Sequence, residues 1–258
     1  MPAATERRLQ MFLLLASCVV VGVFVGAVGI GGVLLIPALM TFSRLPVHEA
    51  AATALFSFLF TGLLGSWLFS RRGTIEWRIS LPVCLGALVS SFAGAALGGR
   101  IPAAVLVWII ATVLLGAGVY ILLPRSSRAS AGAVEKKPPA NKVLVGIGAA
   151  AGFGAGISGA GGPVFSVPLM LAMQFDPLVA VGTGQVVQIA SSLSGSLGNL
   201  GYGTIQYGLA VPVTLAELIG VVAGVRIAHA VPVRQLRLGA ASLCIVSAVG
   251  MVARSIWT

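Results

Sequence analysis

The sequence predicts an all-α membrane protein that crosses the bilayer several times. Hydrophobic residues make up 58% of the 258 positions, and the mean hydropathy is +1.05. Charged residues make up only 9%, against roughly a quarter in a soluble globular chain. This composition excludes a water-soluble domain, a disordered chain and a folded domain that binds nucleic acid through a basic face.

The apolar runs are separated by charged and turn-forming residues. They lie near residues 9–42, 48–69, 79–99, 103–123, 143–173, 178–200, 207–225 and 236–253. A crossing needs about 20 apolar residues, but the first and fifth runs are about 30 residues long and are interrupted by glycines. We expect each of these two to be one broken helix or a hairpin that re-enters the membrane.

A polar segment divides the chain after the fourth run. Residues 124–142 begin with PRSSRASAGAVEKKPPAN, a composition typical of a solvated linker. The predicted organisation is a first transmembrane repeat (9–123), this basic linker (124–142) and a second transmembrane repeat (143–254).

The two halves match at an offset of 130 positions. The matched pairs include glycines 22, 26, 29, 31 and 32 with glycines 152, 156, 159, 161 and 162, Thr53 with Thr183, and Pro82 and Pro102 with Pro212 and Pro232. Matched Gly, Thr and Pro at one offset indicate an internal duplication, which is typical of transporters. We therefore expect about eight transmembrane helices in two homologous four-helix repeats, each beginning with a glycine-broken or re-entrant segment.

The charges between the apolar runs bear on orientation. We interpret the basic residues before and between the runs of the first half and in the linker as cytoplasmic; they are Arg7, Arg8, Arg71, Arg72, Arg78, Arg125, Arg128, Lys136, Lys137 and Lys142. Residues 70–78 carry three arginines and their partners 200–208 carry no charge, whereas 99–103 carry one arginine and 226–237 carry three. This opposite bias favours inverted halves, with parallel halves as the alternative.

The two glycine-rich breaks are the strongest candidates for a binding site. They read GVFVGAVGIGGVLLIP (22–37) and GFGAGISGAGGPVFSVP (152–168). Unwound backbone at membrane depth is tolerated only where it lines a cavity or is buried in protein, and its N–H groups can hold an anion. The candidate site glycines are Gly29, Gly31, Gly32, Gly159, Gly161 and Gly162. Gly22, Gly26, Gly152 and Gly156 are instead predicted to allow close helix packing.

Polar side chains follow each break. Thr53 and Thr183 are the matched pair, and Gln185 and Gln188 lie on one helix face of the second half only. Further hydroxyls are Ser191, Ser192 and Ser194 in the second half and Ser57 and Thr61 in the first. These neutral donors are candidates for binding oxyanion oxygens, and hydrogen bonding between helices is the alternative.

Glu217 lies in the middle of an apolar run. An intramembrane carboxyl group is a candidate proton carrier, and the alternative is a structural role, because the matched residue is Ala87. The sequence shows no catalytic constellation, P-loop or metal-ligand spacing, and Cys18, Cys84 and Cys244 lie in apolar runs. The sequence therefore predicts that the protein is not an enzyme and binds no cofactor or metal.

Both copies of G-x-x-G-x-G-G followed by a proline precede an A-x-x-T helix start (50–53 and 180–183) and a G-T-I-aromatic turn (73–77 and 203–207). Over residues 10–255 this pattern resembles the sulfite exporter TauE/SafE family, also called the TSUP permeases. The resemblance implies transport of small sulfur-containing anions such as sulfite, thiosulfate or sulfoacetate, with the glycine breaks facing the substrate. The extra residue Pro163 in the second break, together with Gln185 and Gln188, suggests binding dominated by the second repeat.

The favoured function is a secondary transporter in the bacterial inner membrane. It would export a sulfonate, sulfite or thiosulfate by alternating access between the repeats, with Glu217 as a candidate for proton coupling. An anion channel and a structural or assembly membrane protein are the alternatives. The expected partners are the anion and the lipid bilayer, with no nucleic acid, and the oligomeric state is left open.

Overall fold

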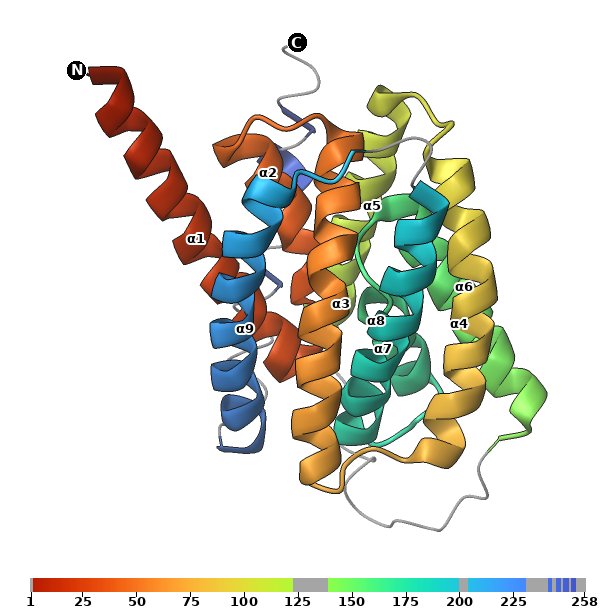
Figure 1. Ribbon diagram of the computed structural model, residues 1–258. Coiled ribbons are helices and arrows are strands. Elements are labelled where there is room, and N and C mark those ends of the chain that lie inside the picture. Colours follow the sequence, from red (N-terminus) through yellow and green to blue (C-terminus); the bar gives the residue numbers. More distant parts are fainter. Residues whose placement is uncertain are drawn as a thin grey trace.

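The computed structural model describes residues 2–122, 139–199, 204–230, 241–242, 245–246, 248–250 and 252–253. Regular structure in this part is entirely helical, as predicted (Figure 1). Its ten helices are α1 (Pro2–Val28), η1 (Gly31–Leu34), α2 (Leu35–Phe42), α3 (Val47–Arg71), α4 (Trp77–Gly98), α5 (Ala103–Leu122), α6 (Asn141–Ser158), α7 (Pro163–Ala172), α8 (Pro177–Asn199) and α9 (Tyr207–Ala230).

Helix boundaries follow the turn residues of the sequence. Pro46 precedes α3, and Gly73 has a φ of +67°, which glycine adopts without strain, at the turn after α3. In the described part, helices long and apolar enough to cross a membrane are Arg8–Val28, Val47–Arg71, Trp77–Gly98, Ala103–Tyr120 and Tyr207–Ala230. Half of the last predicted run and most of the predicted linker lie outside the described residues.

The first and fifth apolar runs are hairpins. A Cβ atom on Gly31 would lie 2.5 Å from the carbonyl oxygen of Val21, so η1 folds back along α1. A Cβ atom on Gly154 would lie 2.9 Å from the ring of Phe165, so α7 folds back along α6. Residues ten positions apart in one straight helix are about 15 Å apart, which excludes a single broken helix for either run.

The long helices run in two directions. The rings of Phe56 and Tyr207, near the starts of α3 and α9, are 5.6 Å apart. Near the ends of the same helices, Arg72 donates a hydrogen bond of 3.1 Å to the carbonyl oxygen of Val225. Helices α3 and α9 are therefore parallel. The pairs α1 and α9, α4 and α6, and α4 and α8 are also parallel, because successive contacts advance along both helices of each pair in the same direction.

Helices α3 and α8 are antiparallel. A Cβ atom on Gly182, near the start of α8, would lie 3.2 Å from the carbonyl oxygen of Thr74, just after α3. A Cβ atom on Gly195, near the end of α8, would lie 3.3 Å from Leu55. Helices α1, α3 and α9 thus run one way and α4, α6 and α8 the other (Figure 1).

Glycines bring the helix pairs α1–α9 and α4–α6 into backbone contact. A Cβ atom on Gly26 would lie 2.5 Å from the carbonyl oxygen of Val221, and one on Gly156 would overlap the carbonyl oxygen of Ser91. Any larger residue at these positions would push the helices apart, because interiors have no room for an added methyl group. The predicted packing role of these glycines is confirmed.

Basic residues occupy both ends of the helix bundle. Arg71 and Arg78 lie where α3 ends and α4 begins, at the end of the molecule where α6 also begins with Lys142. Arg8 lies in the first turns of α1, which begins at the opposite end (Figure 1). Because α1 runs parallel to α3, Arg8 lies at one end and Arg71, Arg78 and Lys142 at the other, so the prediction that all these residues face the same side is wrong.

The helix directions predict which loops share a side of the membrane. Single cysteines at exposed positions Glu76 and Asp176 should react with a membrane-impermeant maleimide from one side, and a cysteine at Arg44 from the other. The background would carry alanine at Cys18, Cys84 and Cys244, and labelling would be compared in right-side-out and inverted vesicles. Labelling of positions 44 and 176 from the same side would contradict the antiparallel arrangement of α3 and α8.

Candidate functional site

The two glycine breaks meet inside the helix bundle. A Cβ atom on Gly32 would lie 3.0 Å from the carbonyl oxygen of Ala160, so the first break touches the second directly. Gly29, Gly159 and Gly161 have φ values of +77°, +69° and +84°, a region that favours glycine. All the predicted site glycines are buried. Unwound backbone is thus enclosed in protein, as its position in an apolar bundle requires.

Phe58 on α3 lies between the two breaks. Cβ atoms on Gly32 and Gly161 would lie 3.1 Å and 3.3 Å from its ring. The side chain is fully buried, and its backbone carbonyl accepts a 3.1 Å hydrogen bond from Gln188 Nε2. Sequence reasoning did not select Phe58, because one phenylalanine in an apolar run carries no distinguishing signal.

The second break offers unpaired hydrogen-bond donors. Within the described residues, the backbone N–H groups of Gly161 and Gly162 have no hydrogen-bond partner. The buried hydroxyl of Ser191 also has none, and a Cβ atom on Gly162 would lie 2.9 Å from its Oγ. Ser191 is one of the hydroxyls that follow the second break in the sequence, and it lies three residues after Gln188 on one helix face. The Ser191 hydroxyl therefore lies beside a break whose backbone donors are unpaired, and hydrogen-bond donors of this kind can bind an oxyanion.

The two glutamines make contacts between helices. Gln188 Nε2 also donates a 2.7 Å hydrogen bond to Thr61 Oγ1. Gln185 Nε2 donates to the carbonyl oxygen of Val25 at the end of α1 (2.9 Å), while its Oε1 has no partner in the described part. Both amide nitrogens therefore tether α8 to its neighbours. The Oε1 of Gln185 is left for another partner.

Thr53 and Thr183 are not brought together, because they lie near the starts of two antiparallel helices. Thr53 Oγ1 accepts a 3.2 Å hydrogen bond from the Gln206 backbone N–H, and Thr183 Oγ1 is 2.9 Å from Ser80 Oγ. The residue two positions before each threonine contacts the break of the other half. Ala51 would be 2.6 Å from a Cβ atom on Gly159, and Val181 would be 3.6 Å from one on Gly29.

Glu217 lies at the junction of α1, α3 and α9. The side chain is fully buried. Ser57 Oγ, one residue before Phe58, donates a hydrogen bond to Oε2, and Oε1 has no hydrogen-bond partner in the described residues. The Glu217 backbone packs against Gly22 of α1. A carboxylate here would be a buried charge without a cation beside it, whereas a carboxyl group would be neutral, so a proton changes the electrostatics of this junction.

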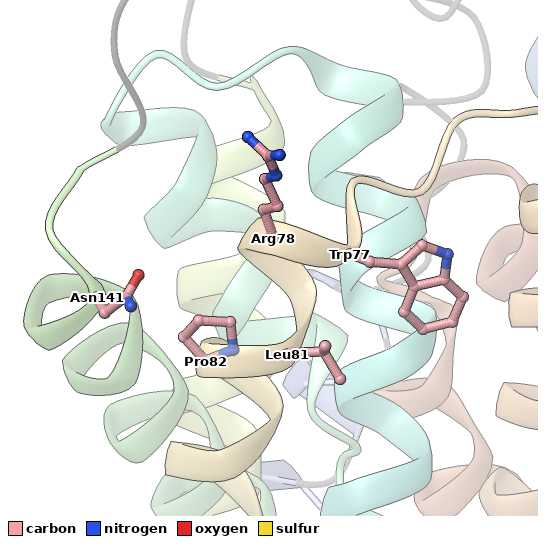
Figure 2. A pocket seen from close by; sticks show the side chains of 5 residues that line it. All are labelled: Trp77, Arg78, Leu81, Pro82 and Asn141. Atoms are coloured by element: carbon pink, nitrogen blue, oxygen red, sulfur yellow. The ribbon is translucent and has the colours of Figure 1, made fainter.

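A pocket of about 390 Å³ lies elsewhere, where α4 and α6 begin (Figure 2). Its lining residues are Trp77, Arg78, Leu81, Pro82 and Asn141. None of them belongs to the breaks or to the cluster around Phe58. The central site is closed to solvent in this conformation.

Comparisons with known proteins agree on one family. Residues 14–251 match the family model described as sulfite exporter TauE/SafE. The chain is 31% identical over 229 residues to the probable membrane transporter protein YdhB of Bacillus subtilis, covering 87% of this chain and 90% of that protein. A probable membrane transporter protein of Methanocaldococcus jannaschii is 24% identical, with 82% and 87% of the two chains covered. No solved structure matches the chain.

Replacing Gly159 by alanine should lower the thermal unfolding midpoint more than replacing Gly73 by alanine. Both glycines have positive φ, so alanine adds backbone strain of roughly 1–2 kcal/mol at either site. Only at Gly159 would the new Cβ meet Ala51, at 2.6 Å, whereas no atom lies within 4 Å of a Cβ on Gly73. Midpoints would be measured on purified protein in detergent. Equal decreases would contradict the contact between this break and α3.

Proposed function

Because the chain belongs to the sulfite exporter TauE/SafE family of membrane transporters, we propose that it is a secondary carrier of small sulfur-containing anions. The substrate class is sulfite, thiosulfate or a C2 sulfonate, and the favoured direction is export across the bacterial inner membrane. The observation that carries this proposal is the unpaired Ser191 hydroxyl beside Gly162, in a break where the N–H groups of Gly161 and Gly162 have no partner in the described residues.

The chemistry of these donors suits an oxyanion. Each buried polar group left without a partner costs about 1–3 kcal/mol, so an occupant that supplies acceptor oxygens is favoured. The donors carry no formal charge, which allows an anion to bind and to leave. We assign Gln185 and Gln188 to orientation of the site, because they hold the end of α1 and the Phe58 carbonyl in place. Binding is therefore dominated by the second half.

We further infer that the halves 9–123 and 143–254 are inverted repeats. Gly26 contacts Val221, and Gly156 contacts Ser91. At the offset of 130, Gly156 is the match of Gly26 and Ser91 is the match of Val221, so the same contact occurs in both halves. Matched helices also run in opposite directions: α1 and α6, α3 and α8, α4 and α9. Two hairpins entering from opposite sides then account for the first and fifth apolar runs. Such halves can exchange conformations to open the site to either side, which is alternating access.

The proposed binding site is tested by flux into proteoliposomes of the purified protein. Sulfite, thiosulfate and a C2 sulfonate would be offered separately, and we expect saturable uptake of at least one. Ser191→Ala should raise KM about fivefold, because one hydrogen bond contributes about 1 kcal/mol. Ser194→Ala is the matched control, since its hydroxyl donates to the Leu88 carbonyl and not to the break.

The outcomes separate the alternatives. Conductance without saturation would establish a channel, and no flux of any of the three anions would exclude this substrate class. An unchanged KM in Ser191→Ala would exclude the proposed cradle. Wild-type transport by both Gln185→Ala and Gln188→Ala would contradict the orienting role of the glutamines.

Proton coupling through Glu217 gives a separate prediction. Wild-type uptake should depend on an imposed pH gradient, and Glu217→Gln should transport without that dependence, because glutamine keeps an acceptor for Ser57 and cannot carry a proton. The facing titratable group is Cys18 on α1, which interacts electrostatically with Glu217. Glu49→Gln is the control, since Glu49 pairs with Gln206 near the start of α3. If uptake by Glu217→Gln still depended on the pH gradient, Glu217 would have a structural role only.

A further inference from the structure

The pocket where α4 and α6 begin combines polar and apolar walls. Figure 2 shows Asn141 at the start of α6 across from Pro82 of α4, with Arg78 and Trp77 in the preceding turn. Arg78 and Asn141 are exposed, and no ion pair or hydrogen bond of Arg78 is found within the described residues. Pro82 lacks an N–H group, so the carbonyl of Arg78 has no intrahelical partner. The pocket thus presents a cation, an amide and an unpaired carbonyl.

An apolar ridge on α4 begins at this pocket and continues along the helix. Its members are spaced three or four residues apart, which puts them on one face. They are Leu81, Leu85, Leu88, Val89 and Phe92, with exposed fractions of 55%, 63%, 40%, 77% and 52%. In a membrane-crossing helix an exposed apolar face lies against lipid tails. Trp77, which is 48% exposed, is a residue typical of the membrane–water interface.

The matched helix α9 supplies an internal comparison. It carries a similar exposed ridge, made of Val211, Leu215 and Ile219. At the offset of 130, however, Arg78 corresponds to Gly208, so α9 has the ridge without the cation. The combination of cation and ridge is specific to α4. The same end of the molecule carries Arg71, Lys142 and Arg226, which makes it attractive to anionic lipid.

We propose that this pocket binds the headgroup of an anionic phospholipid. The phosphodiester lies between Arg78 and Asn141, a headgroup hydroxyl donates to the Arg78 carbonyl, and one acyl chain lies along the ridge from Leu81 to Phe92. Arg78 forms a charge-assisted bond to the phosphate, and the ridge distinguishes a lipid from a water-soluble phosphate ester. This inference does not depend on the proposed substrate.

The test is a lipid titration of the purified full-length protein in detergent. Binding of phosphatidylglycerol, phosphatidylcholine and glycerol 3-phosphate would be measured by native mass spectrometry. We expect phosphatidylglycerol to bind at least tenfold more tightly than the other two. Arg78→Gln should weaken that binding about tenfold, as loss of a charge-assisted hydrogen bond predicts. Arg71→Gln is the matched control, because it removes an exposed charge at the same end that stacks on Trp67 outside the pocket.

Each contrary outcome overturns a defined part of the proposal. Equal losses in Arg78→Gln and Arg71→Gln would show general charge attraction without a site. Equal affinity for glycerol 3-phosphate would assign the pocket to a free phosphate ester. Leu85→Ser should weaken phosphatidylglycerol binding and leave glycerol 3-phosphate binding unchanged. If Leu85→Ser bound phosphatidylglycerol as tightly as the wild type, the acyl chain would not lie along the ridge.

Discussion

Burial of unwound backbone is the constraint on which the rest of the structure depends. Each half interrupts a helix at a cluster of glycines, and the freed peptide groups lie among apolar helices where bulk water cannot satisfy them. In the structure the two breaks cover each other, because Gly32 contacts Ala160. Phe58 then fills the space beside both breaks. The same contact that removes backbone from lipid also places the unpaired N–H groups of Gly161 and Gly162 inside the bundle.

Close helix packing follows from that constraint. A break held in contact with its counterpart needs hairpin arms that cannot shift, and the arms α1 and α6 are fixed by backbone-to-backbone contact with α9 and α4. Glycines at positions 22, 26, 152 and 156 make this approach possible, so the two sets of glycines have distinct physical roles. One set allows helices to touch, and the other allows the chain to leave the helix. A substitution in either set acts on the same central contact.

The sequence was sufficient to predict the helices and to separate these two glycine roles, because length, hydropathy and turn residues act locally. Helix direction was harder, since a glycine cluster alone permits a broken helix or a hairpin, and only contacts such as that of Gly154 with Phe165 decide between them. The same limit explains why Thr53 and Thr183, equivalent in sequence, lie near opposite ends. Phe58 was missed because its role arises in part from the second break, which lies more than a hundred residues away. Ser191 was one of several hydroxyls, and only its contact with Gly162 singles it out. The prediction of one cytoplasmic side for all the basic residues was wrong because it rested on charge without helix direction.

The two halves differ in chemistry at positions that the proposed site uses. At the offset of 130, Ser191 corresponds to Thr61, whose hydroxyl is already bonded to Gln188, and Glu217 corresponds to Ala87. The buried carboxyl group of α9 bonds to Ser57 on α3, one residue from Phe58, and Phe58 touches both breaks. A movement that changed the contact between the breaks would therefore change the surroundings of Phe58 and, along α3, those of the carboxyl group. In the proposed mechanism, α3 is the element that would link anion binding to protonation of Glu217.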